Sequence, residues 1–355
     1  MANLKQLSEK LGLSQTTISR ALNGYPEVSE ATRRRVIEAA REHDYEPNSS
    51  ARRLATGKSR TIGHVVPISH HDMINPHFTD FIAGAGAVYN RRGYDMLISV
   101  VDSAQEAATY RALKRNGRVD GIIVHAPIVR DPRPAMLRKL GLPFVVHGRT
   151  LDDEASYAWV DVNNCRAFRE ATQHLIGLGH RRIALVNGLE HMAFAQRRRE
   201  GYESALREAG IAVDGTLMSS DEMIEPAGYE AMRRFLALAE PPTAVLCASA
   251  LSALGVMGAA REDNLLPGTG ISIICYDDCL SFLDIGPDGM GLTVMRSAIR
   301  EAGEHCASML IDRIEGRQTA GRILLEAKLI EGRSTARCRP APGRRAAHKA
   351  PATPG

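Results

Sequence analysis

The middle of the chain, residues 61–278, alternates short apolar runs with longer amphipathic segments. Its first half contains TIGHVVPI (61–68), DMLISVV (95–101), GIIVHAP (121–127) and FVVHGR (144–149), with helices predicted near 78–92 and 104–116. Its second half contains RIALVNG (182–188), LMSSD (217–221), AVLCAS (244–249) and ISIICYDD (271–278), with helices predicted at 163–178, 194–209, 227–239 and 251–262. Continuous apolar strands alternating with helices predict parallel sheets that helices cover on both faces.

Polar and charged residues gather where the predicted strands end. In open parallel sheets, ligands bind beyond the carboxyl ends of the strands, and two sheets joined by crossovers enclose a cleft there. The residues expected near this cleft are Pro67 to Phe78, Gly148-Arg149, Asn163-Asn164, Gly188 to Arg198, Asp221 to Glu225, Ser249 and Tyr276 to Asp278.

Signatures of catalysis are weak, so we expect no enzymatic activity, no cofactor and no metal. Gly84-x-Gly86 falls inside a predicted helix instead of following a strand, which argues against a dinucleotide fingerprint. His70-His71-Asp72 is better explained as a polar loop, and Asp277 and Asp278 should point in opposite directions at a strand end. Cys275 and Cys279 have no second ligand pair at metal spacing, so reduced thiols are expected.

Charge is distributed unevenly along the 355 residues, which are too many for one core. Residues 1–60 carry 11 Lys/Arg and 7 Asp/Glu, residues 61–332 carry 28 and 34, and residues 333–355 carry 6 and none. The basic head attracts phosphates, whereas the acidic body repels them. We expect the Pro-, Ala- and Arg-rich tail, 333–355, to be disordered. Without a membrane-length apolar run or a secretory pattern, a cytoplasmic protein is expected.

Residues 1–47 predict short helices around a small core. The first carries the stripe Leu4, Leu7 and Leu11 and ends at Gly12, and the second begins after the N-cap residue Ser14. A tight glycine turn between two short helices is typical of a helix-turn-helix, although a plain helical hairpin fits the periodicity equally well. The second helix buries Ile18, Ala21 and Leu22, exposes Gln15, Thr16, Ser19 and Arg20, and ends at Asn23-Gly24. Gln, Thr and Arg suit the edges of bases in the major groove.

Two further segments follow. Ser29 caps a third helix, in which Val36, Ile37 and Ala40 complete the core. Arg33 to Arg35 form a basic run early in this helix, for which a solvated face is an alternative to a functional one. Asn48 and Gly57 then bound roughly two helical turns containing Arg52, Arg53 and Leu54. Because so short a helix is marginal by itself, we expect it to fold only when docked.

One continuous string joins these segments: LKQLSEKLGLSQTTISRALNGYPEVSEATRRRVIEAA, then YEPNSSARRL. In its helix spacing, in Ser-x-x-Thr-Ile-Ser-Arg-Ala-Leu-Asn (14–23) and in Tyr-x-Pro-Asn before Ala-Arg-x-Leu (45–54), it resembles the LacI (lactose repressor)/GalR family of transcriptional regulators. The chain departs at His43-Asp44, where the family usually has Leu-Gly at a helix end, a change expected to be mild.

The resemblance implies a λ-repressor-like helix-turn-helix domain over 1–47 and a hinge helix with linker over 48–60. It places Gln15 and Thr16 on major-groove bases with Arg20 beside them, and Leu54 as a wedge in the minor groove at the operator centre. The implied DNA-binding residues are Ser14, Gln15, Thr16, Thr17, Ser19, Arg20, Asn23, Asn48, Ala51 and Leu54.

Residues 61–332 resemble the family's α/β periplasmic-binding-protein-like (type I) core of two subdomains. Matching strings are Asn75-Pro76-x-Phe78, HLIGLGHRRI (174–183), Arg198-x-x-Gly201-Tyr202, Tyr276-Asp277-Asp278 and Leu292-Thr293-Val294. By position, Arg198 bonds the effector and Asp277 is its carboxylate counterpart, since charge-assisted hydrogen bonds suit sugar hydroxyls. The implied effector-binding residues are Asn75, Phe78, Arg149, Asn163, Arg198, Met223, Ser249 and Asp277.

Departures from the family pattern bear on the ligand. Asn163-Asn164 stands where Asp-Asn is common, Ser249-Ala250 where Asn-Asp is common, Cys275 where Gly is usual, and Met223 where an aromatic stacker often lies. These departures leave the predicted pocket with less charge than the family pattern, which favours a neutral, hydroxyl-rich ligand over a purine. With His147-Gly148-Arg149, the chain is most similar to regulators of α-glucoside or disaccharide uptake.

These features predict a sequence-specific DNA-binding regulator, in our leading interpretation a repressor, whose operator binding is controlled by a small sugar in the core cleft. The resemblance implies a homodimer that binds a palindromic operator in the nucleoid, with cleft closure changing the spacing of the hinge helices. The tail lacks the apolar heptads of a coiled coil. The alternatives are a sugar-binding protein, a sugar-active enzyme and an architectural DNA-binding protein.

Overall fold

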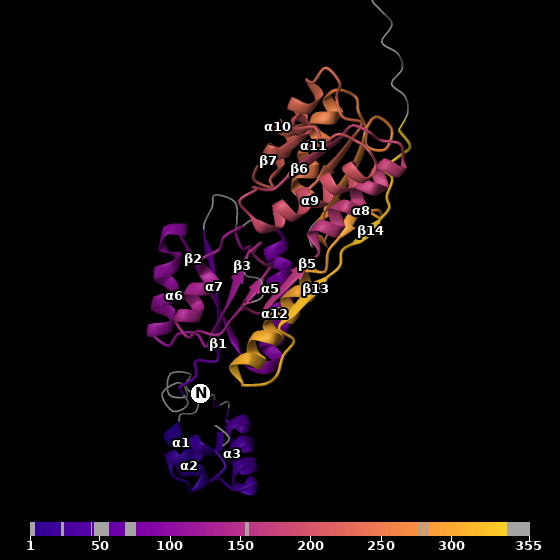
Figure 1. The fold of residues 1–355 in the computed structure, drawn as a ribbon. Coiled ribbons are helices and arrows are strands. Elements are labelled where there is room, and N and C mark those ends of the chain that lie inside the picture. Colours follow the sequence, from indigo (N-terminus) through magenta and orange to yellow (C-terminus); the bar gives the residue numbers. More distant parts are fainter. Residues whose placement is uncertain are drawn as a thin grey trace, which may run out of the picture.

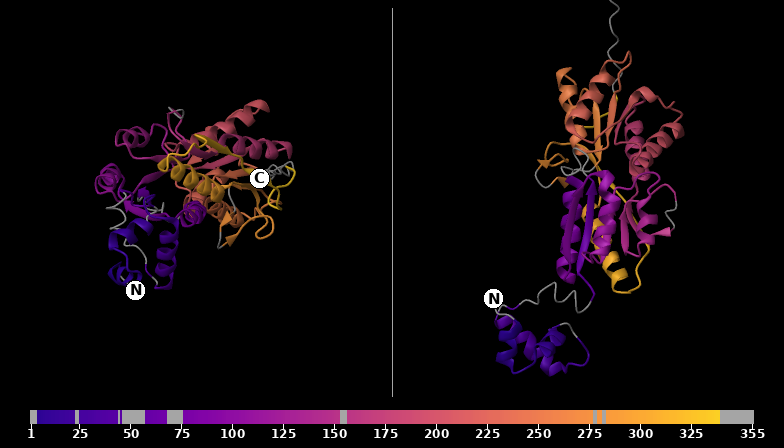
Figure 2. Two further views of the ribbon diagram at one scale, coloured as in Figure 1. Left: turned by 90° about the horizontal axis from the view of Figure 1, so that it is seen from below. Right: turned by 90° about the vertical axis from the view of Figure 1, so that its left-hand side faces the viewer.

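The computed structural model describes residues 4–22, 25–43, 45, 57–67, 76–152, 156–276, 279–280 and 283–338. These residues form a small helical head and a larger core built on two six-stranded sheets, which Figures 1 and 2 show in three orientations. Six of the expected site residues lie outside the described residues: Asn23, Asn48, Ala51, Leu54, Asn75 and Asp277.

The described head consists of three helices, α1 (Leu4–Leu11), α2 (Gln15–Leu22) and α3 (Glu30–Glu42). Gly12 ends α1 with φ +62°, a left-handed conformation that glycine adopts without strain. The Ser14 hydroxyl accepts a hydrogen bond from the Thr17 N–H at 3.0 Å, and the Ser29 hydroxyl accepts one from the Thr32 N–H at 3.2 Å. Both predicted N-caps are therefore confirmed.

The core of the head is small and apolar, made of Leu7, Ile18, Ala21, Val36, Ala39 and Ala40. Ile37, which was expected in this core, is only half-buried, and Ala39 takes the inward position instead. Arg34 and Arg35 are exposed, as a solvated basic run would be, but Arg33 is not. Its guanidinium donates to the Tyr25 carbonyl at 2.9 Å and pairs with Glu30 at 3.1 Å. The turn before α3 is thus held to the helix by Arg33.

The first core sheet has the strand order β13-β5-β4-β3-β1-β2, and its paired strands run parallel. Its strands are β1 (Thr61–Pro67), β2 (Asp95–Val101), β3 (Gly121–His125), β4 (Phe144–His147), β5 (Trp159–Val162) and β13 (Arg322–Leu325). Helices α5 (Pro76–Arg92) and α12 (Ile299–Ile314) cover one face, and α6 (Glu106–Arg115) and α7 (Arg133–Lys139) cover the other (Figure 1). A 3-10 turn, η2 (Ser103–Gln105), precedes α6.

The second core sheet has the order β14-β12-β9-β8-β6-β7 and is parallel except for β14, which is antiparallel to β12. Its strands are β6 (Ile183–Asn187), β7 (Met218–Ser220), β8 (Ala244–Cys247), β9 (Ser272–Tyr276), β12 (Thr293–Arg296) and β14 (Lys328–Ile330). Helices α8 (Asn164–Gly177) and α9 (Ala193–Glu208) cover one face, and α10 (Glu225–Leu236) and α11 (Ala250–Glu262) cover the other. A 3-10 turn, η4 (Gly215–Leu217), precedes β7, and β10 (Cys279–Leu280) pairs with β11 (Leu283–Asp284). The predicted parallel sheets, covered on both faces, are confirmed.

The chain passes between the two sheets after β5, after β12 and after β13. Consequently α12 and β13, late in the sequence, belong to the first sheet. Helix α12 packs on α5 through glycines: a Cβ on Gly84 would lie 2.1 Å from the Arg300 carbonyl oxygen, and one on Gly303 would lie 2.2 Å from that of Phe81. Gly84 and Gly86 are indeed inside a helix, and Gly84 permits near-contact of two backbones.

The predicted boundary at residue 332 is wrong, because residues 333–338 are part of the core. The hydroxyl of buried Ser334 accepts from the Thr293 N–H at 2.8 Å and donates to the Ile273 carbonyl at 2.6 Å. The Cys338 N–H donates to the Leu178 carbonyl at 2.8 Å. Composition alone predicted disorder here, because it does not show that the backbone of residues 333–338 hydrogen-bonds to the core. Residues 339–355 lie outside the described residues.

Candidate functional site: a DNA-binding face and an effector cleft

The outward face of α2 presents the residues that were expected to contact DNA. Gln15, Thr16 and Arg20 are exposed, whereas Thr17 and Ser19 are half-buried. The Thr17 hydroxyl lies 2.8 Å from that of Ser14, so these two side chains organise the start of the helix. The face that could enter a groove therefore begins with one glutamine and one threonine and ends with one arginine.

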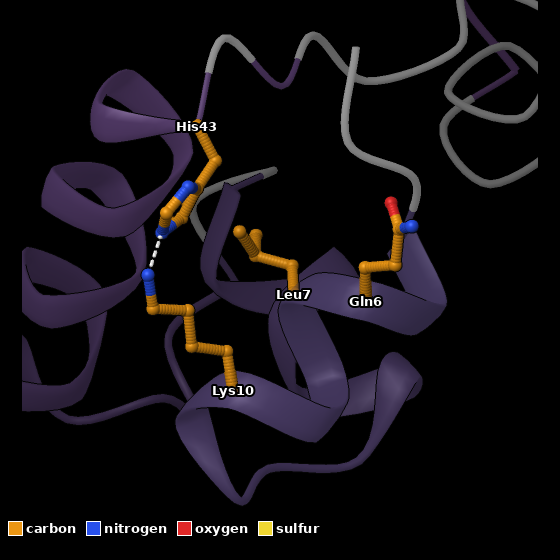
Figure 3. Close-up of a pocket in the computed structure, with 4 residues that line it drawn as sticks. All are labelled: Gln6, Leu7, Lys10 and His43. Atoms are coloured by element: carbon orange, nitrogen blue, oxygen red, sulfur yellow. Dashed lines mark hydrogen bonds between the residues drawn. The ribbon is translucent and has the colours of Figure 1, made fainter.

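A hollow on the head lies between α1 and the end of α3, lined by Gln6, Leu7, Lys10 and His43 (Figure 3). The Lys10 ammonium donates to Nε2 of His43, and the His43 N–H caps α3 by bonding to the Ala39 carbonyl. His43 thus occupies a helix end, as expected for this departure from the family pattern. The hollow holds one amine and one imidazole, which join α1 to α3.

Arg198 on α9 is a buried arginine with several polar and aromatic contacts. It lies in the second subdomain, which is built on the second core sheet, as the first subdomain is built on the first. Its guanidinium donates to Oδ1 of Asn164 and to the Ala248 carbonyl, each at 2.8 Å, and only 6% of the residue is exposed. Its carbon centre lies 4.0 Å from the ring centroid of Tyr276 and 4.7 Å from that of Phe194. Cation–π contacts in a desolvated site hold such a cation firmly, so this arginine is preorganised.

Met223 and Ser249 lie beside Arg198. The Met223 sulfur accepts from Nη1 of Arg198 at 3.7 Å, and the Ser249 hydroxyl lies 3.2 Å from the Met223 carbonyl. Ser249 also caps α11 by accepting from the Ser252 N–H at 3.0 Å. The structure therefore brings together three of the expected effector residues, which follow the carboxyl ends of β6, β7 and β8.

Asn163 is placed differently. Its side chain caps α8 by accepting from the Arg166 N–H at 3.2 Å, and it donates to Glu326 at 3.1 Å. The next residue, Asn164, is the one that bonds to Arg198. Sequence reasoning placed Asn164, Phe194 and Tyr276 among the strand ends but assigned them no role, because a pattern does not reveal which of two adjacent amides turns inward.

Arg149, in the first subdomain, is held by an ion pair. Its Nε lies 2.9 Å from Oδ2 of Asp161, and its guanidinium lies over the Trp159 ring at 5.2 Å. Burial raises the pKa of Asp161, and the hydrogen bond and charge of Arg149 oppose that rise. The two groups neutralise each other beside the cleft.

The two subdomains contact each other directly along the carboxyl ends of their strands. Arg197 on α9 donates to the carbonyls of Arg149 and Thr150, at 2.9 and 2.8 Å, and is 7% exposed. Residues 127–129, after β3, pair with residues 191–193, after β6, through the Val129 N–H to His191 O bond (2.9 Å) and the Ala193 N–H to Pro127 O bond (3.0 Å). These four hydrogen bonds bridge the cleft.

Phe78, the remaining described effector candidate, packs edge-on against His125, with ring centroids 5.3 Å apart. Nδ1 of His64 lies 2.9 Å from Nε2 of His125, and its Nε2 lies 3.0 Å from the Tyr89 hydroxyl. Burial lowers the pKa of His64 to about 3, and burial with the neighbouring histidines lowers that of His125 well below its usual value. Both imidazoles are neutral near pH 7. Sequence reasoning missed this cluster because its members are far apart in the chain.

Within the described ranges, no cluster of three His, Cys, Asp or Glu side chains could hold a metal ion. Cys247, Cys275 and Cys306 are buried free thiols, and Cys165 and Cys338 are half-buried free thiols. The described helices include none that is long and apolar enough to cross a membrane.

A helix-turn-helix head joined to two α/β subdomains that meet at the carboxyl ends of their strands is typical of one class of DNA-binding transcriptional regulators. Residues 3–48 match the model of bacterial regulatory proteins of the lacI family, and residues 172–335 match a periplasmic binding protein-like domain. The chain is 46% identical over 309 residues to the HTH-type transcriptional regulator AglR of Rhizobium meliloti (strain 1021), covering 87% of each. The chain belongs to the LacI family, and it is a DNA-binding transcriptional regulator.

Other relatives agree with this assignment. The HTH-type transcriptional regulator CelR of Thermobifida fusca is 32% identical, covering 92% of this chain and 96% of its own. A solved CelR–cellobiose complex superposes with a TM-score of 0.71 at 30% identity, covering 94% of this chain and all of that one. The lac repressor dimer bound to operator and the anti-inducer ONPF has a TM-score of 0.77 at 24% identity, covering 94% and 99%, and shares the fold.

Proposed function

We propose that the chain is a repressor whose operator binding is controlled by a small neutral sugar, an α-glucoside or a disaccharide, bound between the two core subdomains. The observation that carries the proposal is the preorganised Arg198, clamped by Asn164 and stacked on Tyr276 beside the cleft. A guanidinium fixed before binding donates to sugar hydroxyls without a further loss of side-chain entropy.

Neutralised charges around the cleft favour an uncharged ligand. Arg149 pairs with Asp161, and Arg133 pairs with the fully buried Asp131 at 2.6 Å and with Glu106 at 3.0 Å. The imidazole of His125 is neutral, since its pKa is lowered. A phosphorylated sugar would need unneutralised cations, whereas hydroxyls can use neutral imidazoles and shared guanidiniums. The bound cellobiose of the CelR complex supports a disaccharide.

Arg198→Ala and Arg199→Ala in the full-length chain test the effector site. Arg199 is adjacent on α9, but it is 40% exposed and pairs with Glu190 and Glu203. In a thermal-shift screen of maltose, cellobiose and other disaccharides, a sugar that binds the folded state raises the wild-type melting temperature. The shift should vanish in Arg198→Ala and persist in Arg199→Ala. An equal shift in both variants would place the sugar elsewhere.

We propose that α2 reads the operator through Gln15, Thr16 and Arg20, within the wider set of Ser14, Thr17, Ser19, Asn23, Asn48, Ala51 and Leu54. Arg20→Ala should weaken binding to a selected operator by about 1–3 kcal/mol, relative to a scrambled duplex, because a base contact is lost. Arg41→Ala, an exposed arginine in the last turn of α3, serves as the control. Unchanged discrimination between the duplexes in Arg20→Ala would contradict the assignment.

We propose that the chain acts as a homodimer on a palindromic operator in the cytoplasm, at the nucleoid. Strand β2 is the edge of the first sheet, and it exposes Ile98 (44%) and Val100 (38%). Exposed apolar side chains on an edge strand favour association with another chain. Ile98→Asp should shift the mass measured by analytical ultracentrifugation toward the monomer, whereas a mass unchanged from wild type would contradict this surface.

We propose that the chain has no catalytic activity, since the grouped residues hold and orient rather than activate a nucleophile. The alternative of a sugar-active enzyme predicts turnover of the stabilising disaccharide, which a product assay by chromatography would detect. A sugar-binding protein without a regulatory role would bind the disaccharide with no effect on DNA binding.

A further inference from the structure

The linker between head and core, residues 57–60, is fastened to the core by one carboxylate. Oδ1 of Asp120, just before β3, accepts from the Ser59 N–H at 2.7 Å and from the Ser59 hydroxyl at 2.9 Å. Oδ2 of Asp120 accepts from the Arg60 N–H at 2.8 Å. The Asp120 carboxylate thus accepts three hydrogen bonds, and hydrogen bonds to a charged acceptor are stronger than those between neutral groups.

Arg60 completes the anchor with an uncommon backbone. Its φ is +52°, a left-handed conformation that residues other than glycine rarely adopt. Its carbonyl accepts from the Asp95 N–H at 2.7 Å, its Nη1 donates to the Arg92 carbonyl at 3.4 Å, and its guanidinium lies 5.3 Å from the centroid of the Tyr94 ring. Strained backbone persists only where its surroundings over-determine it. The direction in which the linker leaves β1 is therefore fixed.

The end of helix α12 contacts Arg92 and Tyr94, the two residues that contact the Arg60 side chain. Nη2 of Arg92 bonds to Asp312 at 2.8 Å and to Glu315 at 3.0 Å. The Tyr94 hydroxyl donates to Glu315 at 3.4 Å. Asp312 is in the last turn of α12 and Glu315 is its C-cap, so the end of this helix is bonded to the anchor.

Helices α5 and α12 both run from the cleft side to this anchor. Helix α5 carries Phe78 in its first turn, against His125, and ends at Arg92. Helix α12 has 16 residues, about 24 Å, and starts just after β12, where the chain crosses from the second sheet. The two helices meet backbone to backbone at Gly84 and Gly303, so they should move as one body.

We propose that Asp120 and Arg60 are positioning residues for operator binding: they fix the exit of the linker, and the α5–α12 pair ties that exit to the effector cleft. The inference rests on the proposed function, because it requires operator binding by the head. Loss of the anchor leaves both heads intact, but it lets each leave its core in many directions, which adds ordering entropy to DNA binding.

Asp120→Ala in the full-length chain tests the anchor. The DNA probe is a palindromic duplex selected from a random pool by the wild-type protein, and affinity is measured by fluorescence anisotropy. Operator affinity should fall roughly tenfold or more, from the loss of hydrogen bonds to a charged acceptor. The shift in melting temperature with maltose or cellobiose should match that of the wild type. Asp120→Asn should restore part of the affinity, since an amide oxygen still accepts from an N–H.

Two further variants separate positioning from stability. Asp214 in the second subdomain accepts from the Thr216 N–H and hydroxyl at 2.9 and 2.6 Å, so Asp214→Ala removes similar bonds far from the linker along the chain and should leave operator affinity unchanged. Arg60→Gly relieves the backbone strain, so it should melt close to the wild type yet bind the operator more weakly. It also serves if Asp120→Ala fails to fold.

The outcomes distinguish this inference from the proposed function. If the wild type selects no duplex, the proposed function fails. If the wild type binds its duplex, and both Asp120→Ala and Arg60→Gly bind that duplex with wild-type affinity, the anchor is only a structural contact and the inference is wrong. An equal loss of affinity in Asp214→Ala would likewise overturn it.

Discussion

Arg197→Ala should open the cleft. The guanidinium of Arg197 on the second subdomain makes two hydrogen bonds to the carbonyls of Arg149 and Thr150 on the first, and the residue is 7% exposed. Both bonds exist only while the two subdomains are in contact. Removing them therefore weakens the closed arrangement and leaves an open one unaffected.

The size of the effect follows from the bonds that are lost. A hydrogen bond from a charged group contributes about 1.5–3 kcal/mol, so two contribute at least about 3 kcal/mol to closure. That free energy corresponds to roughly a hundredfold change in the ratio of closed to open molecules. A sugar that contacts both subdomains should lose affinity by up to the same factor, because closure then takes part of its binding free energy.

Small-angle scattering of the full-length chain measures the opening, and calorimetry measures the affinity for the disaccharide that stabilises the wild type. Arg197→Ala should increase the radius of gyration without sugar and bind the sugar more weakly. Arg199→Ala, two positions after Arg197 on the same helix, removes only the ion pairs with Glu190 and Glu203 and is the matched control. If Arg197→Ala has the dimensions and sugar affinity of the wild type, these two hydrogen bonds do not govern closure.

Three further predictions concern stability. Gly84→Ala should destabilise the core by about 1–3 kcal/mol, measured by denaturant unfolding, because the new Cβ would meet a backbone oxygen; Gly86→Ala on the same helix, with no atom nearer than 3.8 Å, should be neutral or stabilising. The neutral form of His64 is favoured by the fold, so its contribution is complete above pH 6.5 and declines as pH falls toward 3, by up to about 1.4 kcal/mol per pH unit; in His64→Leu the unfolding free energy should depend less steeply on pH. A chain ending at Gly332 should melt well below one ending at Cys338, whereas equal melting temperatures would contradict the packing of this segment.

Much of the fold follows from periodicity and end signals. The helix predicted at 163–178 is observed as Asn164–Gly177 with Asn163 and Leu178 as its caps, because an amide at the N-cap is a local signal. Strand β5 was not predicted, since Asp161 interrupts a short apolar run; its buried carboxylate pairs with Arg149 and accepts a hydrogen bond from the Val162 N–H. The return of α12 and β13 to the first sheet depends on packing between distant segments, which no local pattern records.

The candidate site was predictable to the level of the strand ends. Arg198, Met223 and Ser249 were expected near the cleft, and they lie together. Arg197 was not singled out, although it is the neighbour of Arg198 in the sequence. Its hydrogen bonds to the other subdomain become visible only in the folded structure. The hydrogen bond from Asn163 to Glu326 and the burial of His64 against His125 depend in the same way on partners that are remote in sequence.

The central claim is that sugar binding in the core changes DNA binding by the head. The most direct measurement titrates the selected operator duplex with the full-length chain, with and without a saturating disaccharide that raises its melting temperature. Linkage requires that the factor by which sugar changes operator affinity equals the factor by which operator changes sugar affinity. We expect the sugar to weaken operator binding severalfold with this reciprocity. A sugar that binds the core and leaves operator affinity unchanged would contradict the account.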